Sequence, residues 1–343
     1  MIEIVNVEPE LVQLRTRRRG WPSSCNVYLI RDGKRSVLID SGLGVDPSLG
    51  ELLAAMGTAL AEWGQSHRDV HTILLTHTHT DHAGGAVPIA RITGARIMLP
   101  VRGWAQAADP WWQVHHILPP EVRAELTTDY RNFDVVADHF HRETMPDLFS
   151  ADADIVWQLV EDNEEIRIGR YLLKAYHMPG HDVAHLALVD LQRRLAFTGD
   201  LLTARGTSLP WYPGNAGGIS GYLASLQQLS LLALETVCPG HNSVQRGAAV
   251  IAELNRSTQH MVLERDRQIL TALLSGAKTF AFLDNLVYEE AVRAVIPWAS
   301  SVTMAHLIRL NQTGLVSRLE NGLFLTEPIA AERYLRTLQI QME

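Results

Sequence analysis

Short apolar runs alternate with helical patterns over the first hundred residues. Residues 25–30 and 37–40 are apolar and flank a polar turn, which predicts a pair of strands. Residues 47–63 space their apolar positions like a helix, and residues 70–75 form a continuous apolar strand that leads into the sequence THTHTDHAGG and a further helix. Strands that alternate with helices in this way predict an α/β protein.

The apolar pattern changes after residue 100. Residues 101–150 are rich in tryptophan and histidine and predict a mostly helical insertion. The regular pattern then returns and predicts four strands and a helix, followed by a short strand that leads into Cys238; the strands lie at 155–160, 166–175, 184–189 and 195–197, and the helix at 219–233.

A second change of composition follows residue 250. The pattern there predicts a long amphipathic helix, two shorter helices and a β-hairpin with Asn-Gly at its turn, at residues 249–275, 287–294, 301–313 and 315–325. Helices followed by a hairpin predict a small winged-helix-like module. We therefore expect a first domain over residues 1–248, with the helical insertion at 101–150, and a second domain over 249–343.

Composition narrows the class of protein. The chain has 343 residues, of which 46% are hydrophobic, enough for a sizeable core. Its net charge of −8 disfavours a protein that binds nucleic acid, and 2 cysteines are too few for a disulfide framework. The sequence lacks the apolar stretch of a signal peptide and any apolar run long enough to span a membrane, so we expect a cytoplasmic protein.

Four potential metal ligands occur directly after the strand at 70–75: His77, His79, Asp81 and His82. A strand that ends in a turn can bring such side chains together, and zinc binds imidazole nitrogen and carboxylate oxygen at about 2.0–2.2 Å. An alternative is that Thr80 or Asp81 merely caps the following helix. A cap explains one such residue, so this dense run favours a metal site.

Three further segments repeat the arrangement of an apolar strand, a tight glycine turn and a ligand-type residue. They end in His181, Asp200 and His241, within the sequences PGH, TGD and PGH. Four strand ends that converge on one edge predict a site for two metal ions, since helix caps do not explain all four.

The sequences HTHTDH, HMPGH, FTGD and CPGH, in this order and spacing, resemble the metallo-β-lactamase superfamily, as does LIDSGLG at 38–44. The resemblance covers roughly residues 20–245. It implies a four-layered αβ/βα sandwich with two divalent metal ions at one edge, zinc in the first place and iron or manganese as alternatives. It assigns His77, His79 and His181 to one ion, Asp81, His82 and His241 to the other, Asp200 to both, and Asp40 to the orientation of a ligand.

Such a site implies a metal-dependent hydrolase. Two divalent ions about 3.5–4 Å apart produce hydroxide from a bridging water at neutral pH and polarise a carbonyl, while Asp81 orients this nucleophile or accepts its proton. The complete ligand set and the large insertion favour a bulky, partly apolar thioester or lactone as the small-molecule substrate. Because histidines must be neutral to bind metal, we expect activity to fall as the pH drops through the imidazole range.

Aromatic and histidine residues outside the ligand set are candidates for substrate contact: Trp111, Trp112, His115, His185, Trp211 and Tyr212. The insertion that carries the first three can form a lid or pocket wall, or only a satellite hydrophobic cluster. His185 fits a pocket wall, a position behind the ligands or an ordinary buried histidine. Tight-turn chemistry alone explains the Pro-Gly that follows Tyr212.

Three other functions stay open. Persulfide dioxygenases resemble the same motifs, but they use one iron and leave the ligands of the second ion outside the metal shell. A nuclease or phosphodiesterase is disfavoured by the acidic charge, and the helix at 301–315 offers only His306 and Arg309 as basic groups. A non-enzymatic metal scaffold needs no open, water-bearing position, so the intact Asp81 and Asp200 weigh against it.

The C-terminal module can serve a homodimer or close one side of the pocket.

Overall fold

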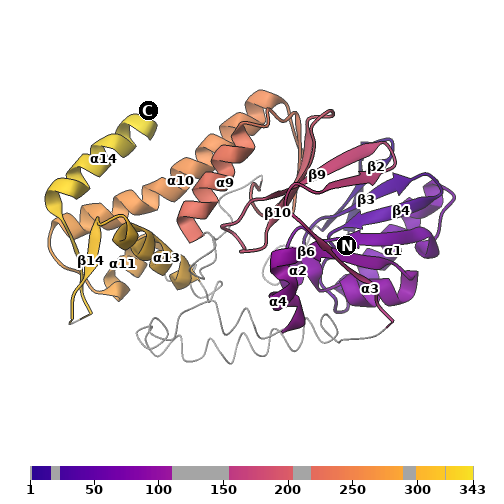
Figure 1. Ribbon diagram of the computed structural model, residues 1–343, viewed down its shortest axis with the longest axis horizontal. Helices are drawn as coiled ribbons and strands as arrows, with labels where there is room; N and C mark the ends of the chain where they lie inside the picture. The colour runs from indigo at the N-terminus through magenta and orange to yellow at the C-terminus, as the bar shows by residue number, and fades with distance from the viewer. Residues whose placement is uncertain are drawn as a thin grey trace.

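Two β-sheets lie face to face between outer helices (Figure 1). The computed structural model describes residues 2–16, 24–109, 154–203, 218–288, 299–320 and 322–342. The predicted four-layered αβ/βα arrangement is confirmed. Apolar clusters fill the space between the two sheets and the space between each sheet and its helices.

The first sheet has seven strands in chain order: β1 (Ile2–Glu8), β2 (Leu11–Thr16), β3 (Val27–Asp32), β4 (Arg35–Ile39), β5 (Val70–Leu74), β6 (Arg96–Pro100) and β7 (Trp157–Val160). β1 to β4 pair antiparallel, and β4 to β7 pair parallel. Parallel neighbours need a crossover connection. α1 (Ser48–Glu62) and a 3₁₀ turn (His67–Asp69) join β4 to β5; α2 (Thr80–Ala83) and α3 (Ala86–Thr93) join β5 to β6.

The second sheet has six strands: β8 (Glu165–Ile168), β9 (Tyr171–His177), β10 (Leu186–Asp190), β11 (Leu195–Gly199), β12 (Thr236–Pro239) and β13 (Gln245–Arg246). All neighbours pair antiparallel except β11 and β12, which are parallel and are joined through α9 (Gly218–Ser230). After β6, a 3₁₀ turn (Val101–Gly103) and α4 (Trp104–Ala108) begin the predicted insertion, most of which lies outside the described residues.

Burial on both faces explains why β10 and β11 are apolar at nearly every position. One face of each strand meets the first sheet, and the other face meets α9. Phe197 of β11 meets Tyr28 of β3 edge to face, with ring centroids 5.2 Å apart. This contact ties the two sheets together.

α10 (Ala248–Leu274) connects the sandwich to a C-terminal module (Figure 1). The first half of α10 packs with α9 against the second sheet. Its second half packs against the rest of the module: α11 (Phe280–Val287), α13 (Ala299–Gln312), the hairpin of β14 (Val316–Arg318) and β15 (Phe324–Thr326), and α14 (Pro328–Met342). The predicted hairpin is present, while the division into domains at residue 248 stays a prediction.

The observed elements differ from the predicted ones around β8 and around α11. The strand predicted at 166–175 is two strands, β8 and β9, which pair across a turn where Gly169 adopts a φ of 53°. The sequence pattern did not predict α11, which begins after Thr279 and ends at Val287. Thr279 caps this helix, because its hydroxyl accepts a hydrogen bond from the Phe282 amide. The helix predicted near 287–294 lies almost wholly outside the described ranges and stays a prediction.

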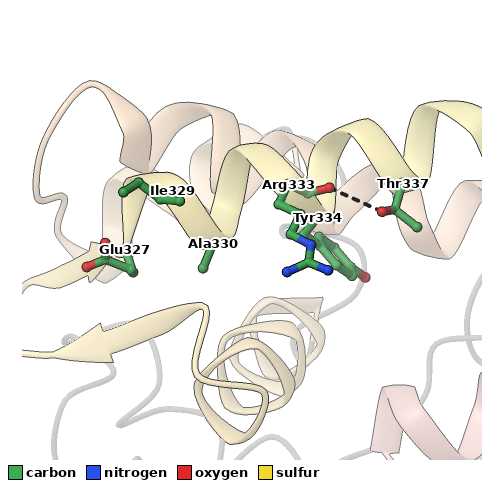
Figure 2. Close-up of a pocket in the computed structure, with 6 residues that line it drawn as sticks. All are labelled: Glu327, Ile329, Ala330, Arg333, Tyr334 and Thr337. Atoms are coloured by element: carbon green, nitrogen blue, oxygen red, sulfur yellow. Dashed lines mark hydrogen bonds between the residues drawn. The ribbon is translucent and has the colours of Figure 1, made fainter.

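A hollow of about 530 Å³ lies along α14, lined by Glu327, Ile329, Ala330, Arg333, Tyr334 and Thr337 (Figure 2). None of these residues belongs to a group of described side chains that could hold a metal ion. The predicted metal ligands lie elsewhere, at one edge of the sandwich. Among the described helices, none is long and apolar enough to cross a membrane.

Candidate metal centre

The candidate ligands leave their strands at one edge of the sandwich. The side chains come from the segments after β5, β9, β11 and β12, and they are His77, His79, Asp81, His82, His181, Asp200 and His241. Within each sheet the strands β4 and β5, and β11 and β12, run parallel, so their carboxyl ends meet at the same edge. The structure brings all seven predicted ligands together.

The first cluster consists of His77, His79 and His181. The Nδ1 atom of His79 lies 3.1 Å from the Nε2 atom of His77 and 2.9 Å from the Nε2 atom of His181. All three side chains are buried. Three converging imidazole nitrogens are a ligand set of catalytic zinc sites.

The second cluster consists of Asp81, His82 and His241. The Oδ2 atom of Asp81 lies 3.2 Å from the Nε2 atom of His241 and 3.8 Å from that of His82. His241 is the most exposed of the seven candidate ligands, with 26% of its side chain accessible. Water therefore reaches the centre from the side of His241.

Asp200 lies between the two clusters. Its Oδ1 atom lies 3.2 Å from the Nε2 atom of His82. Its Oδ2 atom lies 3.4 Å from the Nε2 atom of His241 and 3.6 Å from that of His181. One carboxylate thus faces both clusters, which is the arrangement of a bridging ligand.

Several buried polar atoms at this centre make no hydrogen bond, among them the Nε2 atom of His82 and the Oδ1 atom of Asp200. A buried polar atom without a partner costs about 1–3 kcal/mol, and a cation that binds both atoms removes this cost. Imidazoles and carboxylates are also the ligands that zinc, iron and manganese accept. The residues present therefore fit divalent metal ions, and the cluster can hold them.

The two clusters differ in charge when no metal is bound. Burial lowers the pKa of His77 and of His79 well below its usual value, and neighbouring histidines lower it further. Burial also lowers the pKa of His241, but Asp200 and Asp81 raise this pKa by more, to about 10. For His82, the surrounding negative groups likewise outweigh burial and raise the pKa well above its usual value. At pH 7 His77 and His79 are therefore neutral, and His82 and His241 are protonated.

Asp40 acts on His82 rather than on the space between the clusters. Its Oδ2 atom accepts a hydrogen bond from the Nδ1 atom of His82 over 2.8 Å, and its Oδ1 atom accepts one from the Thr76 amide over 2.8 Å. A proton held on Nδ1 leaves the Nε2 atom of His82 for a metal. Asp40 adopts a φ of 59°, which aspartate tolerates better than most residues. The geometry supports the predicted orienting role of Asp40.

Gly240 lies against the second cluster. A Cβ atom at this position would lie 2.4 Å from the Oδ1 atom of Asp200 and 2.6 Å from the Cε1 atom of His82. Both distances are far shorter than van der Waals contact. Only glycine lets the turn that carries His241 approach so closely.

A polar clamp from the first sheet, formed by Gln13, Asn26 and Tyr28, holds this turn. The Nδ2 atom of Asn26 donates to the carbonyls of Pro239 and Asn242, over 2.9 and 2.7 Å. The Tyr28 hydroxyl donates to the Pro239 carbonyl over 2.8 Å, and the Gln13 side chain donates to Asn242 over 3.0 Å. The clamp fixes the position of His241 across the two sheets.

Comparison with known families agrees with this geometry. The model of the metallo-β-lactamase superfamily matches residues 20–241. The chain belongs to this superfamily. A metallo-β-lactamase family protein from Thermus thermophilus has the same fold, with a TM-score of 0.70 at 24% identity over 94% of this chain and 100% of that protein. The likeness includes the C-terminal module, since it spans almost the whole chain.

Two relatives in sequence carry names that describe hydrolases. The acyl-coenzyme A thioesterase MBLAC2 of Gallus gallus is 26% identical over 235 residues, which are 63% of this chain and 72% of the relative. The hydroxyacylglutathione hydrolase of Cereibacter sphaeroides is 30% identical over 208 residues, which are 60% of this chain and 62% of the relative.

His185 lies behind the metal centre of this superfamily member. Its ring is fully buried, with its centroid 5.0 Å from that of His77, and its Nε2 atom accepts a hydrogen bond from the Asp200 amide over 3.1 Å. Burial lowers the pKa of His185 well below its usual value, so the ring is neutral and can accept this bond. The other predicted substrate residues lie outside the described residues: Trp111, Trp112, His115, Trp211 and Tyr212.

Sequence reasoning missed five residues that support the centre: Gln13, Asn26, Tyr28, Gln106 and Asp182. They come from four segments, and all except Asp182 are far in sequence from any ligand motif. Asp182 directly follows His181, and a carboxylate next to a ligand histidine is the one signal that could have found it. Burial raises the pKa of Asp182 to about 6, although the Ala184 amide and Gln106 lower it.

Proposed function

We propose that this protein is a hydrolase that cleaves thioesters with two divalent metal ions, zinc in the first place. The observation that carries the proposal is the position of Asp200, whose carboxylate faces two separate ligand clusters. The names of the two relatives support a hydrolase, and both point to acyl groups carried by coenzyme A or glutathione. A lactone, which presents a similar carbonyl, is the second substrate class.

The residues of the chain have distinct tasks in this reaction. Two divalent ions held by these residues would lower the pKa of a bound water and would polarise the substrate carbonyl. Asp81 lies beside His241, at the exposed side of the centre, where its Oδ2 atom can accept the proton that the water gives up. Asp40 keeps His82 in the required orientation, and the polar clamp keeps His241 in reach of Asp81 and Asp200.

The arrangement supports two ions rather than one iron. In a mononuclear dioxygenase the ligands of the second ion would stand outside the metal shell. Here single ligand atoms of Asp81, His82 and His241 lie within 4.8 Å of one another, as do those of the first cluster. Asp200 connects the two groups.

The proposal is tested by assaying the zinc-loaded protein on an acyl-coenzyme A, a hydroxyacylglutathione, a lactone and a phosphodiester in parallel. Released thiol is measured with a chromogenic reagent, to which the buried Cys25 and Cys238 contribute little. We expect hydrolysis of at least one thioester, lost on chelation and restored by zinc, and lost in Asp200→Asn. Cleavage of the phosphodiester without any thioester, or oxygen uptake with a persulfide, would overturn the proposal.

A further inference from the structure

Asp182 faces the first cluster from behind, on the side away from the other two histidines. Its Oδ2 atom lies 3.6 Å from the Nε2 atom of His79. The other ring nitrogen of His79, Nδ1, faces His77 and His181. His79 thus stands between a carboxylate on one side and the space for a metal ion on the other.

The carboxylate of Asp182 is itself held in place. Its Oδ1 atom accepts a hydrogen bond from the Ala184 amide over 2.7 Å, and its Oδ2 atom accepts one from the Gln106 side chain over 3.0 Å. Gln106 in turn accepts a hydrogen bond from the Thr78 hydroxyl. Asp182 and Gln106 are both buried. The contacts therefore run from Thr78 through Gln106 and Asp182 to His79, which follows Thr78 in the ligand motif.

The approach of α4 makes this chain of contacts possible. Gly103 precedes α4, and a Cβ atom there would lie 2.9 Å from the Cγ2 atom of Thr78 and 3.3 Å from the Cβ atom of Ala184. The backbone before α4 thus touches both the ligand motif after β5 and the turn after β9. Gln106 follows within the same helix, and it reaches Asp182 from there.

We infer that Asp182, fixed by Gln106, is the positioning residue of His79, holding the proton on Nε2 and directing Nδ1 to the first metal ion. Histidines that bind metal almost always donate their other ring N–H to a carboxylate, a carbonyl or water. Asp40 already does this for His82 in the second cluster. We expect this contact, which is 3.6 Å here, to close to hydrogen-bond distance when His79 binds metal.

This inference rests on the metal centre of the proposed function, but its test does not need the substrate. Zinc affinity is measured by competition with a chromophoric chelator for the wild-type protein and for Asp182→Asn, which keeps the volume and removes the charge. We expect one of the two zinc ions to bind about 10- to 100-fold more weakly. The control Val183→Ala, in the same turn, should bind both ions within about twofold of the wild type.

A second readout separates positioning from mere support of the fold. In the zinc-loaded protein labelled with ¹⁵N-histidine, the Nε2 proton of His79 should resonate at low field, and Asp182→Asn should shift it upfield. Should Asp182→Asn fail to fold, Gln106→Met removes the donor to Asp182 and should weaken the same ion by several-fold. Unchanged zinc affinity together with an unchanged His79 signal in a folded variant would overturn the inference. Asp182-dependent zinc binding without thioester hydrolysis would instead overturn only the proposed function.

Discussion

Individual side chains divide the metal centre into a neutral and a charged half. Without metal, burial lowers the pKa of His77 and His79. Against the effect of burial, the Cys25 thiol and the nearby carboxylates raise the pKa of His82, and Asp200 and Asp81 raise that of His241. A histidine must give up its proton before it binds a metal ion. We therefore expect metal binding at the two clusters to release different numbers of protons.

Zinc binding should release no protons from His77 and His79, whereas binding to His82 and His241 should release about two per chain at pH 7. Because the pKa values of His82 and His241 are raised, protons compete with metal there already at neutral pH, and the second ion should be lost first as the pH falls. Calorimetric titration of the metal-free protein with zinc, in two buffers of different ionisation enthalpy, measures this release. Equal release in both binding steps would contradict the assignment.

Gly240→Ala should remove metal from the second cluster without unfolding the protein. The new methyl group would overlap the Oδ1 atom of Asp200, which must move away from its position between the clusters. Gly221→Ala in α9 is the control, because its Cβ atom would have ordinary contacts and alanine favours helix by about 0.5–1 kcal/mol. Metal content and thermal unfolding of both variants check this prediction. Full zinc content in Gly240→Ala would show that zinc binding does not require Asp200 in its observed position.

The seven candidate ligands could be predicted because each sits in a short motif at the end of a strand. Asp182, Gln106 and Asn26 could not, since their partners are set by how distant segments pack. Asn26, for example, belongs to the segment that enters β3 but holds the turn after β12 in the other sheet. Local patterns carry no information on such contacts between sheets.

The position of His241 depends on contacts between elements, because donors from the first sheet hold the turn that carries it. The turn after β12 is held by donors from β2, β3 and the residue before β3, so the first sheet positions a ligand of the second. Asn26→Ala should destabilise the protein by about 2 kcal/mol, because two hydrogen bonds to the turn are lost, although Tyr28 and Gln13 still donate to the same carbonyls. It should also weaken zinc binding at the second cluster more than at the first.

Tyr28→Phe provides a graded comparison for the clamp. It removes one hydroxyl donor and keeps the ring that packs on Phe197, so the expected loss is about 1 kcal/mol. Thermal unfolding and zinc competition measure both variants. Loss of stability without any change in zinc affinity would mean that the clamp supports the sheets but not the metal centre.

Elements with a clear period were predictable from the sequence, and the others were not. α1, α9 and α10 lie within a few residues of their predicted bounds, since their apolar positions recur at helical spacing. β1 has a register shift between Asn6 and Glu8 and is mostly half-buried, so its alternation is weak. α14 also escaped prediction, although Pro328 at its first position is typical of a helix start.

The whole molecule combines a metal-binding sandwich with a module that has its own core. A buried polar network holds the module together: Asp266 of α10 accepts hydrogen bonds from His306 over 2.7 Å, from Tyr334 over 3.3 Å, and from Arg309. These contacts join α10 to α13 and α14. They lie in the second half of α10, beyond the part that packs on the sandwich.

Asp266→Ala should therefore loosen the module and leave the metal centre intact. It leaves Arg309 and His306 without their carboxylate, at an expected cost of about 3–5 kcal/mol. The control Glu264→Ala, in the same helix, breaks an exposed pair with Arg267 and should cost less than about 0.5 kcal/mol. Hydrogen exchange over residues 275–342 and zinc content measure the two effects. A loss of zinc in Asp266→Ala would show that the module and the metal centre fold as one unit.

The number of metal ions per chain tests the proposed function most directly, because Asp200 lies between two clusters. We would determine it by elemental analysis of protein purified without added metal, and again after equilibration with zinc. Two zinc or other divalent ions per chain are expected, with the count reduced in Asp200→Asn. One iron per chain, together with oxygen uptake, would contradict a two-metal hydrolase.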